Sequence, residues 1–248
     1  WAQSNLQGCY AIGEVAGTHG VTRPGGAALN AGQVFAMRCA QHIAAQESPD
    51  HDSDIAGLKT QIAATASEIS RALSSEDGID THDIETEVQA RMSDHAGYIC
   101  RVEDIPAALD GARALHRGID TRGIRIESES KVSAYFNWKH TALASEAVLT
   151  ALNHYAGNGG GSRGARAMCS TEGTAVPVAR NADLEAYRFI EETERDKNTK
   201  IILQYSGGDF EVHERELRGM EDPQTIFFEK NWADYLSGNI FKDGYLHK

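Results

Sequence analysis

No apolar stretch of this chain approaches the roughly 20 residues that a membrane-spanning helix requires. The longest helical patterns are amphipathic instead, so the sequence predicts no transmembrane segment. Lysine and arginine form no local cluster, and the formal net charge of -12 would repel a phosphate backbone. We therefore do not expect nucleic acid as a partner.

The four cysteines lack the close spacing of a metal site. Cys9, Cys39, Cys100 and Cys169 lie far apart in the sequence, and no C-x-x-C pair is present. Zinc sites and iron–sulfur clusters usually contain such pairs, so no metal site is predicted. Free thiols in a reducing compartment are the expected state. We expect a cytoplasmic location, with any membrane association made through a partner protein.

An initial methionine and a signal peptide are also missing, because the chain opens at Trp1 and soon runs into a glycine-rich segment. We therefore expect that an N-terminal portion precedes this sequence in the complete protein. The 248 residues, 41% of them hydrophobic, still provide enough apolar material for one large domain or two small ones.

The first recognisable pattern is Cys-Tyr-Ala-Ile-Gly at residues 9–13, an apolar run ended by glycine that is typical of a buried strand. A glycine-rich loop follows it. From Gly26 to about Gln46, apolar side chains recur around most of a helical circumference, which predicts a buried helix. Residues 1–47 are therefore expected to form one segment of strand, glycine loop and buried helix.

Pro49 and the polar run at residues 50–54 interrupt this pattern and predict a linker at a domain boundary. Apolar residues then recur at helical spacing in four segments. These segments are 55–73, 84–92, a helix that begins near Pro106, and 133–155. Amphipathic helices joined by short polar loops favour an antiparallel bundle, so we predict a helical domain over residues 52–166.

The remaining residues, 167–248, are predicted to form a C-terminal extension. Residues 200–205 and 210–214 flank Ser-Gly-Gly-Asp, which predicts a β-hairpin. The tail at 225–236 contains Phe227, Phe228, Trp232 and Tyr235, and is predicted to be a short aromatic helix laid against the body. The predicted fold class is mainly α with minor β.

The most informative segment is GEVAGTHGVTRPGGAALN, which covers residues 13–30. Its glycines would let the backbone approach a flat ligand closely, and the N-terminus of the following helix offers unpaired N–H groups and a positive dipole end. Such an end stabilises negative charge, which develops around N1 and the C2 carbonyl of a reduced flavin. The segment therefore favours a flavin site.

This run resembles the C-terminal FAD motif of the fumarate reductase/succinate dehydrogenase flavoproteins, with glutamate, His-Gly, arginine and leucine in the same order. It departs from that motif at Pro24, where leucine is common, and at Ala27-Ala28, which replace a frequent Asn-Ser. Residues 88–101 and 144–166 also resemble runs of the family's helical domain. The resemblance implies the C-terminal edge of an FAD-binding α/β domain followed by an antiparallel helical bundle and a small β-hairpin tail.

The resemblance also implies FAD as the cofactor. Gly13 and Glu14 would belong to the cofactor site, where Glu14 would hydrogen-bond a ribityl or ribose hydroxyl. The backbone of Ala28 and Leu29 would contact the pyrimidine edge of the flavin. This interaction needs only main-chain groups, so FAD binding is compatible with the departures from the motif.

On the substrate side, the resemblance assigns Arg23 to hold a carboxylate or carbonyl of the substrate over the flavin ring. Arginine suits this role because its guanidinium binds a carboxylate through two hydrogen bonds and stays charged. His19 would shape the same pocket. No residue of this chain is assigned as a catalytic acid or base.

The function implied is that of an FAD-dependent oxidoreductase, with hydride transfer between flavin N5 and a C–C bond of a small carboxylic acid and with an electron-transfer partner. Two alternatives stay open. The chain is a non-catalytic fragment or assembly module that completes a flavin site in trans, or it belongs to an amino acid oxidase of the same superfamily. If the sheet that should cover the first helix lies outside this chain, apolar surface should be exposed around Val34, Phe35 and Ile43.

Other polar residues have plainer interpretations. Arg101 and Arg163 are predicted to pair with helix ends or carboxylates. The histidines outside the motif, such as His82, His140 and His154, lack the spacing of metal ligands and are expected to be surface or packing residues.

Overall fold

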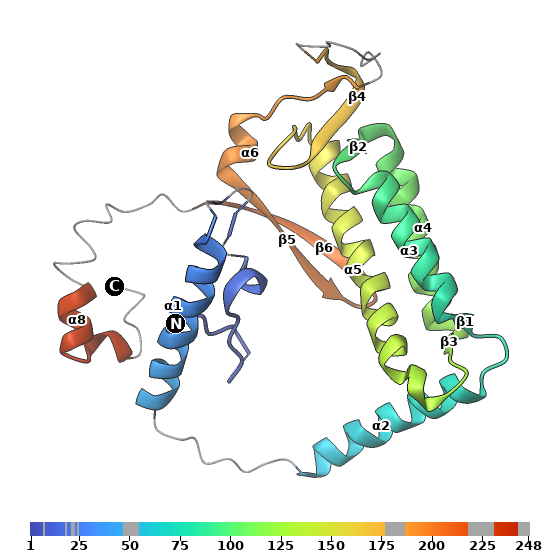
Figure 1. The fold of residues 1–248 in the computed structure, drawn as a ribbon, viewed down its shortest axis with the longest axis horizontal. Coiled ribbons are helices and arrows are strands. Elements are labelled where there is room, and N and C mark those ends of the chain that lie inside the picture. The colour runs from blue at the N-terminus through green and yellow to red at the C-terminus, as the bar shows by residue number, and fades with distance from the viewer. Residues whose placement is uncertain are drawn as a thin grey trace. The chain divides into compact units, whose positions relative to one another are not determined.

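The computed structural model describes residues 1–6, 8–17, 19–20, 23, 25–46, 55–176, 187–217 and 231–242. In these residues the chain is mainly helical, with three two-stranded sheets, as predicted. Contacts divide the chain into two compact units, one made of Trp1–Ser53 with Arg218–Lys248 and the other of Asp54–Leu217. Figure 1 shows the elements of each unit.

The first unit is built around one long helix, α1 (Ala27–Ala45), which agrees with the helix predicted from Gly26. A 3-10 turn, η1 (Gly13–Ala16), contacts α1. A short helix, α8 (Trp232–Leu236), is followed by the 3-10 turn η5 (Asn239–Phe241). The described residues of this unit thus provide very little material to cover its main helix.

The strand predicted at residues 9–13 is wrong. Tyr10 forms only an isolated bridge with Gln3, and the Ser4 amide donates to the Cys9 carbonyl at 2.9 Å, so the segment folds back on itself as an irregular loop. A strand requires a neighbour for its backbone N–H and C=O groups along its whole length. Among the described residues, only the short segment around Gln3 lies beside this run.

The expectation of a buried α1 is also wrong for this chain. Only Cys39 and His42 are buried on α1. Four large apolar side chains are exposed on it: Leu29 (70%), Val34 (44%), Met37 (66%) and Ile43 (52%). The companion expectation of exposed apolar surface is confirmed at Val34 and Ile43, whereas Phe35 is half-buried. The helix is apolar, but the described elements around it are too small to cover it.

The second unit contains the four predicted helices. They are α2 (Ile55–Ser74), α3 (Thr81–His95), α4 (Ile105–Arg122) and α5 (Val132–Gly157). Helices α3, α4 and α5 pack against one another as a bundle, with the largest contact between α4 and α5. Figure 1 shows that α2 joins the bundle only near its C-terminal end and extends away from it.

The prediction that all four helices share one bundle is therefore corrected to a three-helix bundle. Leu58 and Ile62, in the first half of α2, are more than half exposed, whereas Ala72 near its end is buried. The apolar stripe of α2 is real, but only its last turns meet a partner. Helical periodicity cannot show whether a stripe is covered along its whole length.

Local signals explain where these helices begin and end. The Asp80 side chain accepts a hydrogen bond from the His82 amide at 2.9 Å and caps α3. Pro106 lies in the first turn of α4, as predicted, where its missing N–H costs nothing. Gly123 follows α4 with a φ of 77°, a conformation that suits glycine and stops the helix.

Two short parallel strand pairs fix the direction of the helices. Strand β1 (Ile79–Asp80), before α3, pairs with β3 (Ile124–Arg125), after α4, so the start of α3 lies beside the end of α4. Strand β2 (Ile99–Arg101), before α4, pairs with β4 (Ala167–Thr174), after α5. Each pair joins the start of one helix to the end of another, so helices that follow one another in the chain, α3 with α4 and α4 with α5, run antiparallel, as predicted.

The core of this unit forms two clusters along the bundle. One lies near β2 and β4 and includes Ile105, Leu149 and Met168. The other lies toward β1 and β3 and includes Ile84, Ile124 and Tyr135. The 3-10 turns η2 (Val102–Asp104) and η3 (Glu129–Lys131) lead into α4 and α5. Burial of both clusters supplies the main driving force for folding of the unit.

The predicted hairpin is confirmed. Strands β5 (Thr199–Ser206) and β6 (Asp209–Glu216) pair antiparallel in full register and are joined by Gly207 and Gly208, both at positive φ. A five-residue helix, α6 (Glu194–Asn198), precedes them.

The predicted extension at 167–248 is divided between the two units, since residues up to Leu217 belong with the bundle. Of the predicted aromatic helix, Trp232–Leu236 is helical as α8, while residues 225–230, with Phe227 and Phe228, lie outside the described residues.

Candidate functional site

The N-terminal loop is attached to the last turn of α1 by a hydrogen bond between side chains. The Tyr10 hydroxyl and His42 Nδ1 lie 3.2 Å apart, and the two rings meet edge to face. The Ala11 amide also donates to the Ala2 carbonyl at 2.8 Å and closes the loop. These bonds set the point from which the glycine motif begins.

Gly13 then brings the chain onto α1. Its φ is 75°, which favours glycine, and a Cβ at this position would lie 3.9 Å from the Gly32 Cα on the second turn of the helix. The turn η1 that starts here therefore lies against α1. Glu14 is exposed, and its carboxylate makes no hydrogen bond or ion pair with any described residue. The carboxylate is therefore available to a ligand on this side of the helix.

No described residue caps the N-terminus of α1. Gly26, the N-cap residue, has a φ of 80° and provides no side-chain cap, and the first turn contains no acidic residue. The amides of Ala27, Ala28 and Leu29 are the first three of the helix and have no acceptor within it. Ala28 is half-buried and Leu29 is exposed. Uncapped amides with a positive dipole end attract an anion or a polarised carbonyl.

The two residues predicted to bind substrate differ in their surroundings. Both ring nitrogens of His19 are shielded from solvent and have no hydrogen-bond partner among the described residues. A buried, unsatisfied polar group is costly, so a ligand that bonded this ring would remove a penalty. Arg23 is exposed. Four residues next to or between His19 and Arg23 lie outside the described residues: Thr18, Val21, Thr22 and Pro24.

An aromatic cluster on α1 was only partly anticipated from the sequence. Trp1 stacks on His42 at 5.4 Å and on Phe241 at 5.0 Å, measured between ring centroids. The Gln41 amide donates to the Tyr235 hydroxyl at 3.2 Å. The prediction that the aromatic tail lies against the body is thus confirmed for Tyr235. Phe241, which lies beyond the predicted tail, adds to this contact, which covers part of α1 far from its N-terminus.

The run at residues 160–166, which resembles the helical-domain motif of the flavoprotein family, has a structural role here. The Gly161 amide donates to Asp196 Oδ2 at 3.1 Å, and its carbonyl accepts from Tyr155 at 2.7 Å. Arg163 pairs with Glu192 and donates to the Asp196 carbonyl. The structural interpretation of Arg163 is therefore confirmed.

Arg166 has bonding partners in the bundle unit, whereas the side chain of Arg101 has none among the described residues. The Arg166 guanidinium donates to the carbonyls of Ala96 and Gly97 at 2.9 and 3.2 Å, which satisfies the C-terminal end of α3. Arg101, in contrast, is exposed and forms no hydrogen bond or ion pair with a described residue. The predicted pairing of Arg101 is wrong in this structure, because its strand β2 directs the side chain outward.

Sequence reasoning missed a buried contact between a histidine and a glutamate in the bundle. His116 Nδ1 on α4 lies 2.7 Å from Glu146 Oε2 on α5, and Glu146 is only 2% exposed. His116 Nε2 lies 3.3 Å from the Tyr205 hydroxyl on β5. This arrangement attaches the hairpin to the bundle. The two helices are adjacent in the chain, but no local pattern shows that positions 116 and 146 face each other.

Other classes of site find no support among the described residues. No three His, Cys, Asp or Glu side chains gather there as a metal site would require. The four cysteines are free, as predicted, with Cys9 exposed and the others buried. His154 lies 2.8 Å from Glu214, and His82 and His140 are exposed, which confirms their surface and packing roles. None of the described helices has both the length and the apolar character needed to cross a bilayer.

Comparison with known proteins finds no match: the chain fits no protein-family model and resembles no curated protein. The motif at 13–30 and its geometry are therefore the basis for any functional interpretation.

Proposed function

We propose that residues 13–29 form the pyrimidine side of an FAD site in an oxidoreductase that acts on a small carboxylic acid. The observation that carries this proposal is the N-terminus of α1, where the amides of Ala27 to Leu29 have no acceptor among the described residues, together with the packed turn η1. Glycines at positive φ on both sides, at Gly13 and Gly26, leave the backbone accessible to a flat ring.

The residues present fit this cofactor at three points. The α1 amides offer donors and a positive dipole end for the flavin carbonyl and N1. The free carboxylate of Glu14 offers an acceptor for ribityl or ribose hydroxyls. The shielded ring nitrogens of His19 lack partners among the described residues and would gain one from a ligand.

Bound FAD would supply hydride transfer between its N5 and a C–C bond of the substrate. The contribution of this chain is to bind and orient. Arg23 would hold the substrate carboxylate through its two-pronged guanidinium and offset negative charge that develops on it. No residue of this chain is assigned as proton donor. As part of this proposal, the enzyme acts in the cytoplasm and exchanges electrons with a partner.

The exposed apolar face of α1 favours a particular form of the proposal, in which other protein segments complete the site. Leu29, Val34, Met37 and Ile43 are apolar yet exposed, and exposed apolar patches mark surfaces that bind another protein or segment. A sheet or a partner chain laid against α1 would cover these side chains and supply the nucleotide-binding contacts. The chain would then complete a flavin site in trans.

The experiment is a titration of the isotope-labelled chain with FAD, in which NMR spectra of the backbone amides are recorded at each step. Because shift changes report weak binding, a partial site is detectable. We expect the amides of Ala27, Ala28 and Leu29 to shift together with those of Gly13 and Glu14. If FAD leaves this whole segment unchanged, the flavin proposal is wrong.

Matched variants sharpen this titration. Glu14→Gln should weaken FAD binding on the order of tenfold, since a charged acceptor is lost. Glu129→Gln, an exposed residue of the bundle unit, should leave the FAD affinity unchanged. Arg23→Ala should leave FAD binding intact and abolish the effect of an added dicarboxylate on the flavin absorbance band. An equal loss of FAD binding in both glutamine variants would contradict the assigned role of Glu14.

A further inference from the structure

A cavity of about 300 Å³ lies in the bundle unit and is lined by none of the residues of the glycine motif. It is formed where the last turns of α2 and α4 meet the first turns of α5. The lining includes Arg71 from α2, Arg122 from α4 and Lys139 from α5. This volume is at the lower end of the range found for small-molecule sites in proteins.

The floor of the cavity is apolar and rigid. Ala72, Ile119, Ile124 and Tyr135 line it, and all four are at most 6% exposed. They belong to one hydrophobic cluster of the bundle, so their positions are fixed by close packing. An apolar part of a ligand could rest on this floor without moving the helices.

One acidic residue of the lining is fully matched by neighbours. Glu68 Oε1 accepts from the Tyr135 hydroxyl at 2.7 Å and also from the Lys139 ammonium. The hydrogen bond from Lys139, followed by the one from Tyr135, holds the pKa of Glu68 below its usual range. Burial and the bond to Glu68 raise the pKa of Tyr135. Glu68 and Lys139 therefore form a neutral pair, and Lys139 is occupied.

The other acidic residue of the lining, Asp120, lies 3.6 Å from His116 Nε2 and is exposed. Arg71 and Arg122 differ from both acids because no carboxylate of a described residue lies within ion-pair distance of either guanidinium. After the Glu68–Lys139 pair is set aside, the lining holds two arginines, of which Arg71 also interacts electrostatically with Glu68, against one remaining acid, Asp120. The cavity therefore has an excess of positive charge on an acidic protein.

Both arginines lie in the last turn of their helices, where a cation also stabilises the negative dipole end. That role explains a positive charge at each position. It leaves unexplained that both arginines, although exposed, line the same cavity above its apolar floor. A guanidinium fork is the group best suited to bind a carboxylate or phosphate in such a place.

From this geometry we propose that the cavity binds a small organic anion, with its carboxylate or phosphate held by Arg71 and Arg122 and its apolar part on Ile119 and Ile124. The site is a second one, independent of the flavin proposal. It uses a different unit of the chain and a different set of residues, so the failure of one proposal leaves the other intact.

The test is methyl NMR of the full chain during separate titrations with inorganic phosphate and with malonate. Ile119 and Ile124 line the cavity and report its occupation, whereas Ile105, buried in the other cluster, serves as the internal reference. We expect the first two methyl signals to shift with at least one of the two anions. Sodium chloride at matched ionic strength is the control for general screening.

The two anions distinguish the two sources of the same chemistry. A shift with phosphate alone indicates a phosphate-bearing ligand, and a shift with malonate alone indicates a carboxylate-bearing one. If neither anion moves Ile119 and Ile124 beyond the chloride control, the proposal is overturned.

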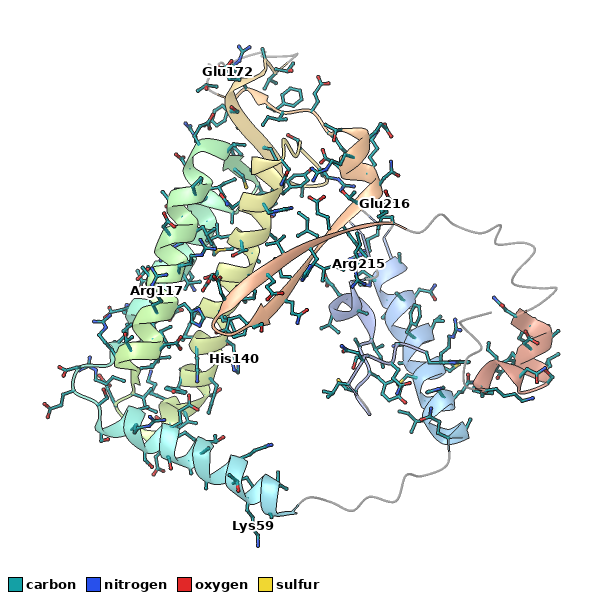
Figure 2. All side chains as sticks on the ribbon, turned by 180° about the vertical axis from the view of Figure 1, so that it is seen from behind. Lys59, Arg117, His140, Glu172, Arg215 and Glu216 are labelled. Carbon is teal, nitrogen blue, oxygen red and sulfur yellow. The ribbon has the colours of Figure 1, made fainter. Side chains whose placement is uncertain are left out.

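Variants test whether the arginines do the binding. Arg71→Gln and Arg122→Gln, made singly, should each weaken the anion on the order of tenfold, which is the loss of one charged hydrogen-bond pair. Arg117→Gln is the matched control, because Arg117 is an exposed arginine of α4 outside the cavity lining, as labelled in Figure 2. Arginines that only stabilise helix ends would leave the anion affinity unchanged in all three variants, and that result would refute the site.

Discussion

Helices α1 and α5 are equally apolar on average, yet they bury their side chains very differently. Eight residues of α5 are buried, against two of α1. The difference lies in what surrounds each helix: α5 packs on two other helices and a hairpin, while the described residues around α1 form only short turns and loops. An apolar helix thus indicates a surface that needs a partner, and only its neighbours decide whether that partner is present.

The largest expected effect comes from the buried side of this comparison. Leu149 on α5 is 0% exposed and belongs to a core cluster. Leu149→Ala should lower the free energy of unfolding of the bundle unit by about 2–5 kcal/mol, because apolar contacts are lost and a cavity remains. Urea denaturation followed by circular dichroism measures this change. Leu58→Ala, at an exposed leucine of α2, is the control and should change it by less than about 0.5 kcal/mol.

A close backbone approach in the bundle unit predicts a second large effect. A Cβ at Gly161 would lie 2.0 Å from the Glu191 carbonyl oxygen, which is far inside contact distance. Gly161→Ala should destabilise the unit by about 1–3 kcal/mol, since backbone must shift to admit the methyl group. Gly157, the last residue of α5, has open space around it, and Gly157→Ala should be neutral or stabilising. Equal stability of both variants would contradict this prediction, because it would show that the loop at 190–192 moves to admit the methyl group at little cost.

The Glu68 cluster predicts a smaller, pH-dependent effect. Because the pKa of Glu68 is lowered in the folded chain, its stabilisation is present above the unfolded-state pKa of about 4.3 and is lost as the pH falls through the lower folded pKa. Glu68→Gln should cost less than about 1 kcal/mol near neutral pH and should flatten the acid limb of the stability curve. Thermal unfolding as a function of pH measures it. Glu129→Gln should retain the acid limb of the wild type.

The smallest effect is expected on the exposed side of the comparison. Met37 on α1 is 66% exposed, so Met37→Gln removes no buried surface and should change the unfolding free energy by no more than about 0.5 kcal/mol. The same substitution should reduce self-association at high concentration, since it interrupts an apolar patch. Light scattering measures this. A loss of stability like that of Leu149→Ala would mean that Met37 is covered in solution.

The sequence predicted the helices well, because each carries a stripe of apolar residues with a clear start or stop signal, such as Pro106 at the beginning of α4. It predicted the hairpin equally well from Gly207 and Gly208. The strand at 9–13 failed because an apolar run of five residues becomes a strand only beside another strand. The prediction that the first half of α2 packs in the bundle failed for the same reason, since Leu58 has no covering partner among the described residues.

The candidate site was predictable only in part. The glycine motif predicted the open N-terminus of α1, which local sequence determines through Gly26. It did not predict that His19 would lack a partner among the described residues, nor that Arg71 and Arg122 would enclose one cavity. These facts depend on which elements meet, and positions 71 and 122 are separated by β1, α3, β2 and almost all of α4.

The sequence by itself determined the helices and the hairpin of this protein: the helical periods, the capping residues and the glycines that permit a positive φ act within a few residues of each other. Only the tertiary structure decided which apolar faces are buried, which charges are paired and where a cavity remains. Burial and pairing are properties of contacts between distant segments. That is why α5 became core, while α1, equally apolar, keeps a face exposed.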